Sequence, residues 1–207
     1  MSNTLYYFHD PMCSWCYAFQ PTLKQISEQL PEGVGIIKLL GGLAVDSDEP
    51  MPGDMQQNIQ DGWQRIVQRV PGTQFNFDFW NHCKPRRSTY PACRAVIAAR
   101  LQGSGNDELM TQAIQRAYYQ QARNPSDNST LIELAVEIGL NEKQFHDALL
   151  SDEVDELLKN EIETTEEMHI DSFPSMVLKV DESFWPVAVE YTDPQKVLES
   201  ITFLLEN

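Results

Sequence analysis

The sequence has few basic residues. Lysine and arginine number 15 against 31 aspartates and glutamates in 207 residues, so the net charge is −16. A chain this acidic repels polyanions, which argues against nucleic acid or an anionic membrane as a partner. It also lacks an apolar stretch of transmembrane length and, in its first residues, the basic and apolar segments of a secretory signal. We therefore expect a cytoplasmic protein.

Cysteine is scarce as well. The four cysteines are Cys13, Cys16, Cys83 and Cys93. In a reducing compartment, so few cysteines favour catalytic or free thiols over structural disulfides. Cys83 and Cys93 do not have the usual spacing of zinc ligands. We expect both to be free thiols rather than a second, regulatory pair, and we expect no metal site.

The chain is organised around residues 10–21, which contain the Cys13-Ser14-Trp15-Cys16 motif. An apolar run at 4–8 predicts a buried strand before the motif, and apolar residues at helical spacing predict a helix over 13–30. The free N–H groups at a helix N-terminus stabilise a thiolate, so this junction favours a reactive thiol. A zinc half-site and two inert core thiols are the alternatives, and the strand-to-helix context favours redox chemistry.

The remaining pattern predicts an α/β fold. A second apolar strand at 34–40 completes a strand–helix–strand unit, whose strands pair in parallel. Amphipathic helical patterns then fill residues 54–167, apart from a loop-like stretch at 73–87. Ser88 or Thr89 can cap the helix after that stretch, in which we expect Cys93 to pack as a small hydrophobe. Two short strands follow at 176–180 and 184–189, and the chain ends in a helix that begins near Asp193.

This order resembles a thioredoxin fold (β-α-β … β-β-α) with a large all-helical insertion between the second and third strands. More closely, the chain resembles the DsbA-like thiol–disulfide oxidoreductases with a Cys-Ser-Trp-Cys motif. The residues that carry the resemblance are Asp10 to Cys16, Ser88 to Arg94 and Ser172 to Ser175. It implies a discontinuous thioredoxin-like domain of residues 1–50 and 168–207, interrupted by a helical insertion domain of residues 51–167.

The resemblance also implies roles for individual residues. Cys13 would be the attacking, more exposed thiol, and Cys16 the more buried resolving thiol. Pro174 would form the family's cis-proline peptide and bring its loop against the thiol pair. The Phe173 backbone would then bind an extended substrate by β-addition.

Other residues are candidates for contacting the substrate or for adjusting the pKa of the thiolate. We expect Trp15 and Phe19, with Phe173, to contribute to substrate choice. His9 and Ser14 are candidate thiolate-tuning residues, although His9 at the end of a strand is also compatible with a surface position. Because Ser14-Trp15 contains no histidine, we expect a less oxidising protein than secreted oxidases.

The sequence therefore predicts a thiol–disulfide oxidoreductase that needs no metal or organic cofactor. Its substrates would be thiols or disulfides, mainly of proteins, and glutathione or a partner reductase would recycle it. One alternative is a glutathione-dependent transferase or isomerase of the kappa-class or chromene-carboxylate isomerase type, which usually has serine at the position of Cys13. A second alternative is a non-enzymatic peptide-binding or holdase module.

Overall fold

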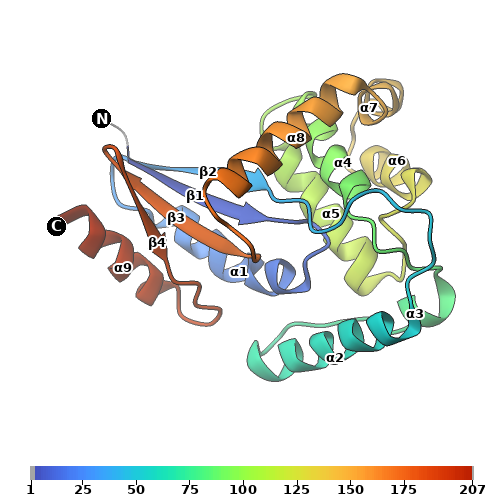
Figure 1. Ribbon diagram of the computed structural model, residues 1–207, viewed down its shortest axis with the longest axis horizontal. Coiled ribbons are helices and arrows are strands. Elements are labelled where there is room, and N and C mark those ends of the chain that lie inside the picture. The colour runs from blue at the N-terminus through green and yellow to red at the C-terminus, as the bar shows by residue number, and fades with distance from the viewer. Residues whose placement is uncertain (1–2, 207) are drawn as a thin grey trace.

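The computed structural model describes residues 3–206 as one mixed sheet with helices against it and beyond one end (Figure 1). The strands are β1 (Asn3–His9), β2 (Val34–Leu40), β3 (Ser175–Val180) and β4 (Ser183–Val187). The helices are α1 (Ser14–Glu28), α2 (Gly53–Arg69), α3 (Phe79–His82), α4 (Tyr90–Arg100), α5 (Asn106–Gln120), α6 (Asn128–Glu137), α7 (Glu142–Leu149), α8 (Asp152–Glu167) and α9 (Pro194–Glu206). Residues 1, 2 and 207, which the predicted domain limits include, lie outside the described residues.

The sheet has the strand order β2-β1-β3-β4. β1 pairs in parallel with β2 and antiparallel with β3, and β4 pairs antiparallel with β3. Pro186 is tolerated in β4 because this strand lies at the edge of the sheet, where a missing N–H costs no ladder bond. The predicted thioredoxin fold with helices inserted between the second and third strands is confirmed.

One face of the sheet is covered by α1 and α9. Alternate β1 residues, Leu5 and Tyr7, are fully buried against Phe19 and Leu23 of α1 and Ile201 of α9. This is the period-two pattern of a strand meeting the apolar stripe of a helix. The core fixes α1 over the sheet and so fixes the motif at its N-terminus.

The inserted helices lie beyond the C-terminal end of β1 (Figure 1). An aliphatic core centred on the buried α4 joins α4 to α5, α6, α7 and α8. A separate aromatic cluster surrounds the fully buried Trp63 of α2 and includes Phe75, Phe79 and Tyr119. Residues 73–87, expected to be a loop, contain the short helix α3 within this cluster. No helix in residues 3–206 is both long and apolar enough to cross a membrane.

Candidate redox site

The motif lies where β1 passes into α1, as predicted. Cys13 is the N-cap of α1, and its Sγ accepts a hydrogen bond from the Cys16 N–H at 3.3 Å. The same Sγ lies 3.4 Å from the Phe173 carbonyl oxygen, to which the thiol donates. The free helix N–H and the helix dipole both favour negative charge on this sulfur.

The two thiols differ in exposure. Cys13 is 6% exposed and Cys16 is fully buried. Burial raises the pKa of the Cys16 thiol well above its ordinary value, and the neighbouring Cys13 raises it further. All four cysteines are free thiols, so the structure shows the reduced form. The accessible thiol is therefore Cys13, with Cys16 behind it.

The loop before β3 closes the site from the other side. The Phe173–Pro174 peptide bond is cis, as expected, and Pro174 is buried. The Phe173 ring lies so close to Gly41, the residue after β2, that a Cβ on that glycine would overlap the ring. The Phe173 ring therefore packs against the scaffold, and it is the Phe173 backbone that faces Cys13.

A buried carboxylate holds the motif to the inserted helices. Asp10 Oδ1 accepts from the Met12 N–H at 2.7 Å, and Oδ2 accepts from the Leu43 N–H at 2.8 Å and the Thr89 hydroxyl at 2.6 Å. The Cys93 thiol also lies 3.5 Å from Oδ2. We call these five residues the Asp10 node. Burial raises the pKa of Asp10, and the hydrogen bonds from Thr89, Leu43 and Met12 oppose that rise.

The node joins three parts of the chain that are distant in sequence: the motif loop, the loop after β2, and the start of α4. Thr89 precedes α4, but its side chain makes no capping hydrogen bond to that helix. Its hydroxyl donates to Asp10 instead, so Thr89 has the expected N-cap position but makes no side-chain cap. Cys93 packs in the helical core, as expected, and additionally contacts the carboxylate.

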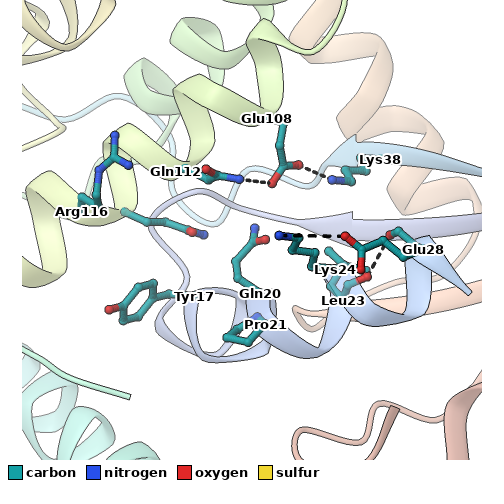
Figure 2. Close-up of a pocket in the computed structure, with 12 residues that line it drawn as sticks. Tyr17, Gln20, Pro21, Leu23, Lys24, Glu28, Lys38, Glu108, Gln112 and Arg116 are labelled. Atoms are coloured by element: carbon teal, nitrogen blue, oxygen red, sulfur yellow. Dashed lines mark hydrogen bonds and ion pairs between the residues drawn. The ribbon is translucent and has the colours of Figure 1, made fainter. Parts of the chain in front are cut away.

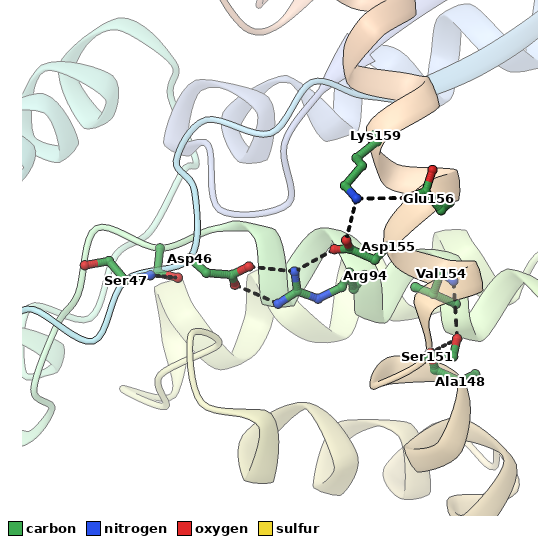
Figure 3. Close-up of polar contacts among 10 residues, drawn as sticks. Asp46, Ser47, Arg94, Ala148, Ser151, Val154, Asp155, Glu156 and Lys159 are labelled. Carbon is green, nitrogen blue, oxygen red and sulfur yellow. Dashed lines mark hydrogen bonds and ion pairs between the residues drawn. The ribbon is translucent and has the colours of Figure 1, made fainter.

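An ion-pair network holds α4 in place next to the node (Figure 3). Arg94, the residue after Cys93, pairs with both carboxylate oxygens of Asp46 at 2.8 and 2.6 Å and with Asp155 of α8 at 3.4 Å. Lys159 pairs with the same Asp155 at 3.1 Å. The hydrogen bonds that Arg94 donates to the Asp46 carboxylate raise the pKa of Arg94. The network ties the loop after β2 to α4 and α8, which supports the node.

Aromatic residues form the outer side of the site. The rings of Trp15 and Tyr191 have centroids 5.1 Å apart, and both residues are half-buried. The Arg69 guanidinium, at the end of α2, lies over both rings. We call Trp15, Tyr191 and Arg69 the aromatic rim. Sequence reasoning placed Trp15 at the site but missed Tyr191 and Arg69, because nothing in the local pattern connects them to the motif.

Two expected site residues have other positions. Phe19 is fully buried in the sheet core, 6.0 Å from the Tyr7 ring, so its expected contact with substrate is wrong. It lies on the inner face of α1, which packs on the sheet. Ser14 is the half-buried first residue of α1, and its proposed tuning role stays a prediction.

His9 is buried rather than on the surface. Its ring stacks on Tyr7 with centroids 5.2 Å apart, and its Nδ1 has no hydrogen-bond partner among the described residues. Burial, and then the Lys38 charge, lower the pKa of His9 to about 3. The imidazole is therefore neutral at physiological pH and brings no positive charge to the thiolate, and the tuning role of His9 stays a prediction.

A cleft of about 580 Å³ lies between α1 and α5 (Figure 2). Its charged lining is largely paired internally: Lys38 with Glu108, and Lys24 with Glu28 at 3.9 Å. Neither cysteine of the motif lines it. Within residues 3–206, no group of three or more His, Cys, Asp and Glu side chains is arranged to hold a metal ion.

Taken with the fold, this geometry defines a disulfide-oxidoreductase-like protein of thioredoxin fold. The family model described as Thioredoxin matches residues 6–194. The chain therefore belongs to the thioredoxin family.

Solved structures with this fold include a Nitrosomonas europaea protein assigned as a protein disulfide isomerase. It has a TM-score of 0.85 and 23% identity, over 100% of this chain and 98% of that one. The cytosolic disulfide reductase DsbM from Pseudomonas aeruginosa has a TM-score of 0.79 and 23% identity, over 98% of both chains. At these identities the likeness shows the shared fold.

Curated relatives carry a different description. The ClpXP adapter protein SpxH of Halalkalibacterium halodurans is 26% identical over 194 residues, which are 90% of this chain and 63% of that protein. The protein of the same name from Bacillus subtilis is 24% identical over 174 residues, 83% of this chain and 56% of that protein. The chain thus spans about three fifths of the length of these relatives.

Proposed function

We propose that this protein is a thiol–disulfide oxidoreductase that uses Cys13 and Cys16 as its redox pair. The observation that carries the proposal is the position of the Cys13 sulfur. It caps α1, accepts the Cys16 N–H, and lies against the Phe173 carbonyl next to a cis-proline. An accessible sulfur at a helix N-terminus with a second thiol behind it is the arrangement that disulfide exchange requires.

In the reaction, the Cys13 thiolate attacks one sulfur of a substrate disulfide. A mixed disulfide with Cys13 forms, and the other substrate sulfur leaves as a thiolate that takes up a proton. Cys16 then loses its proton and attacks the Cys13 sulfur, which releases the second substrate thiol. The pair has lost two electrons and two protons to the substrate, and the reverse sequence inserts a disulfide.

Several finer features belong to the same proposal. The Phe173 backbone binds an extended substrate, Trp15 contacts it, and glutathione or a partner reductase resets the pair. No resident metal or organic cofactor takes part. We propose a cytoplasmic location and a potential on the reducing side of secreted oxidases, since Ser14-Trp15 places no imidazole between the thiols. DsbM, which shares the fold, is named a cytosolic disulfide reductase, and this name supports a cytoplasmic location and a reducing potential.

The test combines a redox titration with three single variants. We expect graded glutathione buffers to give a two-thiol transition that maps to Cys13 and Cys16. Cys13→Ser should abolish exchange, whereas Cys16→Ser should accumulate a mixed disulfide on Cys13, because resolution is lost. Cys83→Ser is the matched control, since Cys83 is a half-buried free thiol outside the motif. Alkylation followed by intact mass and peptide mapping reads each outcome.

If Cys13 stays a free thiol throughout the titration, the redox proposal is wrong, and glutathione-dependent transfer becomes the better explanation. A second candidate is a non-enzymatic adapter that binds a protein partner, which the SpxH descriptions of the curated relatives favour. Under that alternative, a Cys13→Ser, Cys16→Ser double variant retains partner binding and biological activity.

A further inference from the structure

Arg69 occupies a defined position in the aromatic rim. It is the last residue of α2, and it is exposed. Its guanidinium carbon lies 5.7 Å from the ring centroid of Trp15 and 5.8 Å from that of Tyr191. Two rings therefore hold one cation in place through cation–π contacts, which restrict the side chain without neutralising its charge.

The rim adjoins the reacting sulfurs. Trp15 lies between Cys13 and Cys16 in the motif, and its ring contacts that of Tyr191 in a tilted arrangement, with centroids 5.1 Å apart. Burial raises the pKa of Tyr191, and both motif thiols raise it further, as expected for a hydroxyl near the pair. Arg69 thus contacts the motif itself, through the ring of Trp15.

The charge of Arg69 is available to a ligand. Among residues 3–206 it forms no ion pair, although the chain carries 31 acidic residues. Four other arginines are paired, for example Arg94 with Asp46 and Arg100 with Glu161, whereas Arg65, Arg87 and Arg116 share with Arg69 the lack of an ion pair among the described residues. A guanidinium that stacks on rings still presents planar N–H donors, which match the two oxygens of a carboxylate.

A groove runs from the rim along α1. Its volume is about 630 Å³, and Tyr191, Ala18 and Val70, the residue after Arg69, line it. Tyr191 is the residue of the aromatic rim that lines this groove, and Arg69, Trp15 and the motif cysteines do not line it.

We propose that Arg69, held by Trp15 and Tyr191, is a carboxylate-recognition subsite that makes the thiol pair favour disulfides bearing a carboxylate close to the reacting sulfur. The inference rests on the proposed redox function and adds a substrate class to it. The charge of Arg69 also offsets locally the net charge of −16, which repels anionic substrates from most of the surface.

The experiment compares three small disulfides that differ in charge: dithiodiglycolate (anionic), 2-hydroxyethyl disulfide (neutral) and cystamine (cationic). Stopped-flow tryptophan fluorescence follows their reaction with the reduced protein. In Arg69→Gln, we expect the ratio of anionic to neutral rates to fall about three- to tenfold, because one local charge is lost. The difference should shrink at high salt, as screening requires.

Arg65→Gln is the matched control, because Arg65 is an exposed arginine one turn earlier on the same helix. We expect it to leave the ratio within about twofold of wild type, since a distant exposed charge is screened. The proposal is overturned if Arg69→Gln leaves the ratio unchanged, slows all three disulfides equally, or matches Arg65→Gln. If the wild-type protein reacts with none of the disulfides, the redox function itself fails, which is a separate result.

Discussion

The thiol pair lies between two regions of opposite character. On the inner side, the Asp10 node is built around a fully buried carboxylate that accepts two backbone N–H groups and a hydroxyl. On the outer side, the aromatic rim consists of half-buried rings and an exposed guanidinium, held by ring contacts.

The difference separates two tasks. Hydrogen bonds to a buried carboxylate are directional, so the node fixes where the loop before Cys13 begins. Ring and cation–π contacts tolerate small shifts, so the rim can adjust to substrates of different shape. We therefore expect changes in the node to affect mainly folding stability, and changes in the rim to affect mainly exchange.

Removing the Asp10 carboxylate should lower the free energy of unfolding more than any of the other changes. Asp10→Ala leaves the Met12 and Leu43 N–H groups and the Thr89 hydroxyl without their acceptor. We expect a loss of about 3–5 kcal/mol in the free energy of unfolding, because unpaired buried donors are costly. Urea denaturation measures it.

Asp48→Ala is the matched control for this prediction, because Asp48 is exposed and outside the node; we expect less than about 0.5 kcal/mol. Thr89→Val, which removes one donor, should cost about 1 kcal/mol. An Asp10→Ala variant as stable as Asp48→Ala would mean that the node does not hold the fold together.

Truncating the rim should have a smaller effect on stability. Trp15→Ala removes a half-buried ring that contacts Tyr191 and Arg69. We expect a loss of about 1–2 kcal/mol in unfolding free energy, together with slower disulfide exchange. Trp185→Ala is the control, since Trp185 is a 46% exposed ring on the edge strand β4. If both tryptophan variants exchange at the wild-type rate, the rim takes no part in the reaction.

The smallest expected effect is a pH dependence of stability that comes from Asp10. Its pKa is raised in the folded protein by burial, so between the unfolded and folded pKa values the folded state binds more protons. Stability therefore falls as pH rises through this window; the cost is absent below the unfolded pKa and complete above the folded pKa.

The difference in unfolding free energy between wild type and Asp10→Asn isolates this effect from the other acidic groups. We expect the advantage of wild type over the variant to shrink from low to neutral pH, because the pKa of Asp10 is raised in the folded protein. Denaturation of both proteins in parallel between acidic and neutral pH measures it. An advantage that grows with pH would show that the hydrogen bonds, rather than burial, dominate the pKa of Asp10.

Much of the fold was predictable because its signals are local. The alternation of Leu5 and Tyr7 in β1 and the apolar stripe of α1 each report one element and one buried face. The helical run at 54–167 was read correctly as inserted helices. The short helix α3 was missed because its sequence is dominated by aromatic residues, whose packing on Trp63 orders it.

The site was predictable only in part. Cys13 and Cys16 follow from the strand–helix junction, but Phe19, which we expected to contribute to substrate choice, is buried on the inner face of α1. His9 was misjudged because its neighbours in space, Lys38 and Tyr7, set its burial and its charge. Nothing in the sequence near Arg69 indicates that it would lie over Trp15.

The sequence by itself determined the order of the elements and the position of a thiol at a helix N-terminus, because periodicity and capping act over a few residues. Only the tertiary structure decided what surrounds that thiol. The Phe173 carbonyl reaches Cys13 across 160 positions, and Thr89 reaches Asp10 across 79. Such contacts depend on how the sheet and the inserted helices pack together, and no local pattern of residues encodes that packing.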